Sequence, residues 1–219
     1  MQNDKPGIEK VEQKTQERKP AEVRRFEILY AARELFIEKG FDRVSMEDVA
    51  DKVKISKAAV YLYFPSKAEL FLETIGQAVD KLVSDLEMSF TDPPHRSTVE
   101  KLNSANKALQ NYSPVFTMTH HMSESGFPDE VFPPRIIKLF VKRMNERKQR
   151  IWDMLRGVFE HGQNEGEIRP DLPAGELAKL FAIYGMLLAS SEVAYETAKE
   201  VLLKGILKNK RDNLFKEDE

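Results

Sequence analysis

The 219-residue sequence contains no cysteine, which excludes disulfides, thiolate nucleophiles and zinc sites built from cysteine. Long apolar runs are missing too, since no segment reaches the roughly 18 apolar residues that a membrane-spanning helix needs. The charged N-terminus, MQNDKPGIEKVEQKTQERKP, lacks the apolar core of a signal peptide. We therefore expect a cytoplasmic protein with no membrane partner.

Strand patterns are nearly absent, because the sequence has no long alternating β-branched runs and no Asn-Gly turn. Apolar residues recur instead with helical period, and 41% of the chain is hydrophobic, which is enough to bury a core. We predict an all-α fold. The net charge of −2 argues against non-specific binding to nucleic acid, whereas a few well-placed cations suffice for specific binding.

Catalytic signatures are also absent. The sequence has no phosphate loop, no Gly-x-Ser-x-Gly, no zinc-ligand spacing and no Rossmann glycines. His120 and His121 are adjacent, so on a helix their side chains would point about 100° apart and make a poor metal pair. We expect no enzyme, no cofactor and no metal site.

Helix start and stop signals organise the first 90 residues. Residues 1–20 are predicted to be a disordered arm, and a helix is predicted over 21–39. Ser45 begins a capping box before a short helix, Ser56 can cap a second short helix, and a long helix follows over about 67–90. Two short helices joined by a tight turn predict a helix-turn-helix.

The second short helix lies within ISKAAVYLYFPSKAEL. Ala58 and Ala59 would keep its first turn slim enough for the major groove. Tyr61 and Tyr63 would reach phosphates, and Lys67 would add a cation to the DNA backbone. An alternative is a structural role alone, because serines before helices are commonly caps and aromatic runs are commonly core. Whether Lys57 faces a base or a phosphate is open.

Residues 24–71 contain ILYAARELFIEKGFDRVSMEDVADKVKISKAAVYLYFPSKAELF, which resembles the DNA-binding domain of the TetR family of bacterial transcriptional regulators. The resemblance implies that double-stranded DNA is contacted by Ser45, Ser56, Lys57, Ala58, Ala59, Tyr61, Tyr63 and Lys67. Lys54 stands where the family usually has glycine. A left-handed lysine costs about 1 kcal/mol, so we expect a turn that is either strained or different in geometry.

The resemblance also implies two domains, a helix-turn-helix domain over residues 21–67 and a helical domain over 68–219 that binds an effector and forms a homodimer. Beyond residue 95 we expect helices over about 96–112 and 135–164, and two more within 172–207. Small residues in the last two predict the dimer interface, with packing inside one chain as the alternative. The interface residues would be Ala178, Phe181, Ala182, Gly185, Ala189, Ala194, Ala198, Val201 and Gly205.

Large, adaptable side chains between residues 112 and 152 suit a pocket for an apolar or aromatic effector, and ordinary core is the alternative. They are Tyr112, Phe116, Met118, Met122, Phe127, Phe132 and Trp152, with His121 as a polar anchor. The expected function is repression from a palindromic operator that an effector relieves. The alternative is a DNA-binding protein without a small effector, acting as an activator or an architectural factor.

Overall fold

The computed structural model describes residues 20–91, 97–115, 128–187 and 204–207. Within these ranges the all-α prediction is confirmed, and the only extended pairing is an isolated antiparallel bridge between Ile168 and Leu207. None of the described helices is long and apolar enough to cross a membrane. The helices are α1 (Ala21–Lys39), α2 (Met46–Val53), α3 (Lys57–Tyr63), α4 (Lys67–Thr91), α5 (Thr98–Asn111), α7 (Pro134–Asn164) and α8 (Ala174–Leu187).

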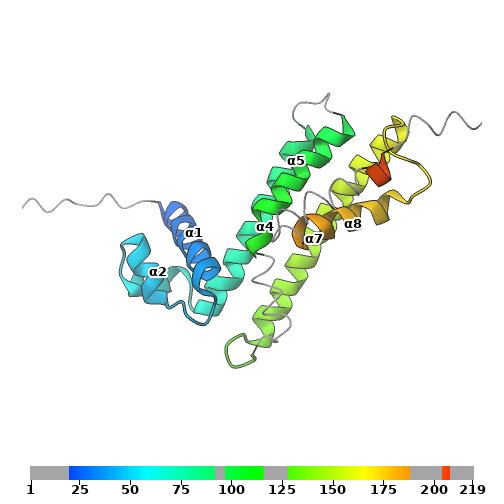
Figure 1. Ribbon diagram of the computed structural model, residues 1–219. Coiled ribbons are helices and arrows are strands. Elements are labelled where there is room, and N and C mark those ends of the chain that lie inside the picture. Colours follow the sequence, from blue (N-terminus) through cyan, green and yellow to red (C-terminus); the bar gives the residue numbers. More distant parts are fainter. Residues whose placement is uncertain (1–19, 92–96, 116–127, 188–203, 208–219) are drawn as a thin grey trace, which may run out of the picture.

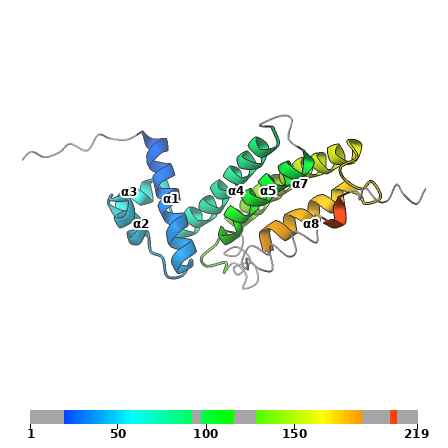
Figure 2. The same ribbon diagram turned by 45° about the horizontal axis from the view of Figure 1, so that its top comes forward.

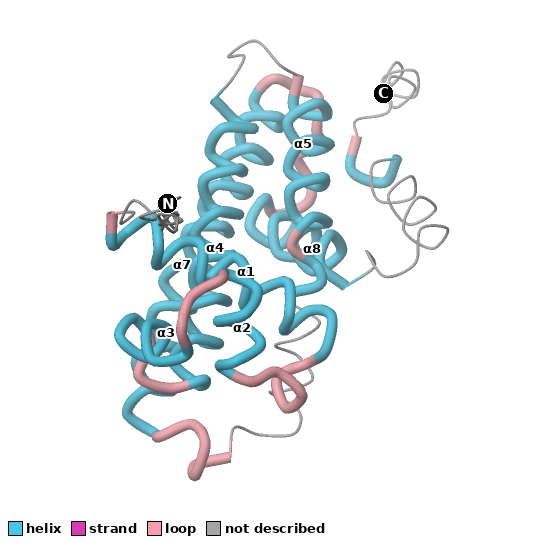
Figure 3. The backbone as a smooth tube through the Cα atoms, turned by 90° about the vertical axis from the view of Figure 1, so that its left-hand side faces the viewer, coloured by secondary structure: helices cyan, strands magenta, loops and turns pink. Residues whose placement is uncertain are grey.

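Helix α4 runs through both parts of the molecule. Helix α1 packs against α4, with α2 packed on α1 and α3 on α2, whereas α5 and α7 also pack along α4 and α8 packs on α5 and α7 (Figures 1 and 2). Figure 3 shows the same division from the side, with the helix-turn-helix below the longer helices. Because α4 is continuous, any tilt of its body moves the three N-terminal helices with it.

Local signals account for the helix ends. The Ser66 hydroxyl oxygen accepts a hydrogen bond from the Glu69 backbone N–H at 3.1 Å and caps α4. Gly40 ends α1 with φ 78° and ψ 164°, a backbone conformation that is essentially restricted to glycine. The expected glycine at the end of the first helix is therefore required by the direction in which the chain leaves it.

An aromatic cluster joins the segment before α7 to the N-terminal helices. The ring of Phe132 is 1% exposed, and its centroid lies 5.0 Å from Phe41 and 6.2 Å from Phe71. Phe36 packs edge-on against Phe71 at 5.0 Å. Phe132 therefore belongs to a core shared with the N-terminal helices rather than to an effector pocket, which corrects the expectation from the sequence.

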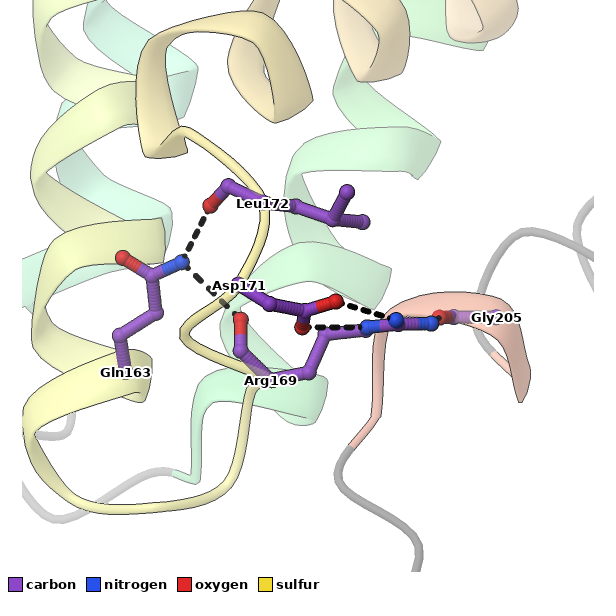
Figure 4. Close-up of polar contacts among 5 residues, drawn as sticks. All are labelled: Gln163, Arg169, Asp171, Leu172 and Gly205. Carbon is purple, nitrogen blue, oxygen red and sulfur yellow. Dashed lines mark hydrogen bonds and ion pairs between the residues drawn. The ribbon is translucent and has the colours of Figure 1, made fainter.

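The end of the described chain is fastened to the turn between α7 and α8 (Figure 4). The Arg169 guanidinium donates to the Gly205 carbonyl oxygen at 3.3 Å and forms an ion pair with Asp171. The Gln163 side-chain amide donates to the carbonyl oxygens of Arg169 and Leu172 at 3.0 and 2.7 Å. The hydrogen bond from Arg169 holds the pKa of Asp171 below its ordinary value.

Helix α8 packs with its small residues inside the chain. Ala178, Phe181 and Ala182 are buried, and a Cβ on Gly185 would lie 2.8 Å from the Leu109 side chain. These four positions were expected in the dimer interface, but α5 and α7 already cover them. Their burial within one chain agrees with the alternative that the sequence left open. Four further expected interface residues lie outside the described residues: Ala189, Ala194, Ala198 and Val201.

Phe132→Ala is expected to lower the free energy of unfolding by about 3–5 kcal/mol, because it removes a buried ring from a closed cluster. Phe26→Ala is the matched control, since Phe26 is 60% exposed and surface substitutions change stability by about 0.5 kcal/mol or less. Urea unfolding followed by circular dichroism measures both. Equal losses in the two variants would contradict the assignment of Phe132 to the core.

Candidate nucleic-acid interface

The two short helices are capped as the sequence predicts. The Ser45 hydroxyl oxygen accepts from the Asp48 N–H at 3.1 Å, and the Asp48 carboxylate accepts from the Ser45 N–H at 2.7 Å. The Ser45 hydroxyl also donates to the Asp48 carboxylate, and this bond, together with the one from the Ser45 backbone N–H, holds the pKa of Asp48 below its ordinary value. The Ser56 hydroxyl oxygen accepts from the Ala59 N–H at 3.2 Å. Both serines therefore act as caps, and both remain exposed at the surface.

The turn between α2 and α3 keeps a left-handed residue. Lys54 has φ 59° and ψ 48°, and among the described residues it is the one non-glycine with positive φ. Its N–H donates to the Asp51 carbonyl at 3.2 Å, and the Ile55 N–H donates to the Ala50 carbonyl at 3.0 Å. These bonds close the end of α2 as a glycine cap would. Of the two expected outcomes, the strained lysine is the one observed.

Helix α3 turns one face inward and another outward. Val60 and Phe64 are fully buried, whereas Tyr61 is 44% exposed and lies on the outer side with Lys57 and Ala58. Ala59 and Tyr63 are half-buried at the edges of this face. The expected arrangement, a small residue in the first turn of α3 with an aromatic side chain beside it, is thus present on the surface.

Sequence reasoning missed Leu62, which is 86% exposed on α3. An apolar side chain held in water on this face can contact a thymine methyl group or the sugar edge of DNA. Its spacing was the available signal, since Leu62 lies two residues from both Val60 and Phe64. On a helix, such a residue points away from the face that those two bury.

Lys57 at the start of α3 and Lys67 at the start of α4 are held differently. The Lys57 ammonium lies 3.3 Å from the Glu47 carboxylate, with both side chains more than half exposed, so the pair is weak and exchangeable. The Lys67 ammonium donates to the carbonyl oxygens of Phe41 and Asp42 at 3.0 and 3.4 Å and lies 4.2 Å above the Phe41 ring. Lys67 thus also braces the loop after α1, and one N–H remains for a phosphate.

The expected effector residues are not brought together in the described part of the chain. Tyr112 is buried, and its hydroxyl donates to the Asp85 carboxylate at 3.0 Å. Burial and this bond raise the pKa of Tyr112 to about 12. Trp152 is half-buried, with the Lys148 ammonium 4.9 Å from its ring. The remaining candidates lie outside the described residues: Phe116, Met118, His121, Met122 and Phe127.

Residues 28–74 match the family model described as "Bacterial regulatory proteins, tetR family". The chain is 31% identical over 107 residues to the HTH-type transcriptional activator FasR of Mycolicibacterium smegmatis, a match that covers 49% of this chain but only 45% of that protein. It is 27% identical over 182 residues to the uncharacterized HTH-type regulator YdeS of Bacillus subtilis, covering 80% of this chain and 84% of the relative.

Solved structures share the fold. The ketosteroid transcriptional regulator KstR2 of Mycobacterium tuberculosis superimposes with a TM-score of 0.60 at 20% identity, covering 85% of this chain and 96% of that one. AibR, solved in complex with isovaleryl coenzyme A and operator DNA, gives a TM-score of 0.59 at 17% identity over 83% and 97% of the two chains. At these identities the likeness establishes the arrangement of the helices.

Lys54→Gly is expected to raise the free energy of unfolding by about 1 kcal/mol, because glycine adopts the left-handed turn without strain. Lys54→Ala is the matched control, since it removes the same charge and keeps the strain. Thermal and urea unfolding compare the two variants. Equal stabilities of the glycine and alanine variants would show that the left-handed turn is not strained.

Alkaline titration should detect Tyr112. Its folded pKa of about 12 lies above the unfolded value of about 10, so its contribution to stability is complete below about pH 10 and is lost as the pH rises through about 12. We expect a tyrosinate absorbance step near pH 12 that Tyr112→Phe removes and that the control Tyr30→Phe, at an exposed position, preserves. A step that survives Tyr112→Phe would assign it to another group.

Proposed function

We propose that this chain, a member of the TetR family of helix-turn-helix transcriptional regulators, is a cytoplasmic repressor that a small apolar or aromatic effector releases from a palindromic operator. The chain is a regulator and not an enzyme. The proposal rests on the outer face of α3. There the small side chain of Ala58, the exposed Tyr61 and Lys57, with its weak ion pair to Glu47, lie together.

Residues 21–67 would form the DNA-binding domain, or reading head, of the molecule. The first turn of α3 would enter the major groove with Ala58 and Ala59, and Tyr61 and Tyr63 would donate hydroxyls to phosphates beside it. Lys57 would exchange its weak bond with Glu47 for DNA, which presents a much denser negative charge. The capping hydroxyls Ser45 and Ser56 sit at the exposed N-terminal ends of α2 and α3, where the phosphate backbone would pass.

A homodimer is part of the proposal, because one helix-turn-helix reads few base pairs and such proteins commonly bind two half-sites about one helical turn apart. Helix α8 supplies a surface for it. Leu180 and Ile183 are 51% and 48% exposed on the side of α8 away from its buried alanines. We add these two exposed residues to the interface candidates from the sequence, which include Ala189, Ala194, Ala198 and Val201.

Residues 68–219 would form the effector-binding and dimerisation domain. Helix α4 extends from Lys67 at the reading head into this domain, so an effector that prefers a different tilt of α4 would change the spacing of the two recognition helices. It shifts the equilibrium only by its difference in affinity for the two states. AibR, which has this fold and was solved in complex with both isovaleryl coenzyme A and operator DNA, supports the idea that one chain of this fold binds a small molecule and DNA.

Activation is the second candidate, favoured by the similarity to FasR, which is named an activator. The same DNA-binding geometry serves either outcome, since the position of the operator relative to a promoter decides between them. Transcription in vitro from a template that carries the selected site separates the two. Less transcript with added protein supports repression, and more transcript supports activation.

Selection of a bound site from random double-stranded DNA tests the proposal. We expect an enriched palindrome, with affinity in an anisotropy titration that falls steeply between two salt concentrations as phosphate contacts are screened. An enriched site without two-fold symmetry would contradict the dimer. The absence of any enriched site would contradict sequence-specific binding.

Lys67→Met is expected to weaken binding to all DNA sequences alike and to reduce the slope of log affinity against log salt by about one, as expected for the loss of a single phosphate contact. Methionine keeps an apolar stem against Phe41 and removes the charge together with the hydrogen bonds to the carbonyl oxygens of Phe41 and Asp42. Lys179→Met on the exposed side of α8 is the control and should leave both quantities unchanged. A change in which sequence is preferred would contradict the phosphate role.

A further inference from the structure

A cleft of about 820 Å³ lies between α1, α4 and the N-terminal half of α7. This volume falls within the range of about 300–1,000 Å³ that is usual for small-molecule sites. Among the described residues that the sequence suggested for the effector pocket, neither Tyr112 nor Trp152 lines this cleft. Its walls come from both the reading head, through α1, and the helical body, through α7.

Two ion pairs cross this cleft. Arg25 on α1 pairs with Glu73 on α4, and the Arg147 guanidinium on α7 binds both carboxylate oxygens of Asp80 on α4 at 2.5 and 2.6 Å. Arg147 also lies close to Gly76 of α4, where a Cβ would be 3.7 Å from Arg147 Nη2, an ordinary van der Waals distance. Two carboxylates of the lining are therefore neutralised by two of its guanidinium groups.

Two further arginines in the lining have no such partner. Arg135 and Arg143 make no hydrogen bond or ion pair within the described residues, and Glu69 is the one remaining carboxylate of the lining. Arg135 also lies in the first turn of α7, which has no side-chain cap and no acidic residue there. A cation at the positive end of a helix is unfavourable by itself, so this end of the cleft attracts an anion.

The wall beside these arginines is apolar. Ile136, Leu139 and Phe140 from α7 line the cleft together with Leu29 and Leu72, and Leu139 is 49% exposed. A simple inorganic anion would leave this surface in contact with water. A ligand with an apolar group next to its charge would cover it and gain the hydrophobic contribution.

We propose that the cleft binds a small amphipathic anion, with a carboxylate or phosphate head on Arg135 and Arg143 and an apolar tail along Leu139 and Phe140. Guanidinium forks suit both heads, because each presents parallel N–H donors to paired oxygens. The regulatory consequence rests on the proposed function. Since the cleft that the ligand would occupy is lined by both α1 and α7, its binding would change the placement of the reading head and hence the affinity for the operator.

Titration calorimetry without DNA tests the site, with octanoate as the probe and octanol as its uncharged counterpart. We expect octanoate to bind at least tenfold more tightly than octanol. The double variant Arg135→Gln/Arg143→Gln should bind octanoate at least tenfold more weakly than the unmodified chain, because charge-assisted bonds are lost. The matched control Lys138→Gln/Lys142→Gln removes two exposed cations from the same helix outside the lining and should bind octanoate normally.

Three results would overturn the site: no octanoate binding, equal binding of octanol, or full binding by the arginine variant. The regulatory consequence is tested by titrating the chain with operator DNA in the presence of octanoate. Unchanged operator affinity at saturating octanoate would overturn it. Because the calorimetry contains no DNA, a chain that binds octanoate through the arginines but selects no operator would contradict the proposed function and leave the site standing.

Discussion

The arrangement of this molecule depends on the packing of the buried Phe132 ring against Phe41 and Phe71, which in turn pack against Phe36. If α4 were the one connection between the reading head and the helical body, the reading head could tilt about that helix. Phe132, in the segment that leads into α7, adds a second contact between the two parts and restricts this tilt. A buried ring that packs against two other rings has little freedom to slide, because protein interiors are closely packed.

The same cluster reaches the DNA-binding surface through Lys67. Its ammonium lies over the Phe41 ring and binds the carbonyl oxygens of Phe41 and Asp42, so the contact that steadies the loop before α2 is made by a residue proposed to bind phosphate. The cleft lies on the neighbouring side of this junction, with arginines from α1 and α7 in one lining. The proposed regulation follows from this geometry, since effector and operator would act on the two ends of one packed unit.

The sequence predicted those features that local chemistry decides. Ser45 and Ser56 begin their helices, and α1 ends at Gly40, because caps and left-handed turns depend on a few neighbouring residues. The strain at Lys54 was one of two expected outcomes for the same reason. The location of Phe132 and the burial of Phe181 and Gly185 were not predicted, since an apolar residue looks alike in the sequence whether it covers a core, a pocket or a partner. Leu62 was missed because its exposure depends on which face of α3 the other helices cover.

A spin-label distance measurement tests most directly whether Phe132 holds the reading head in place. The chain has no cysteine, so Asp51→Cys at the exposed end of α2 carries one label per protomer of the proposed dimer. The account predicts one narrow distribution of label-to-label distances, which Phe132→Leu broadens while the chain stays folded. The same narrow distribution in both proteins would contradict the claim that this ring sets the position of the recognition helices.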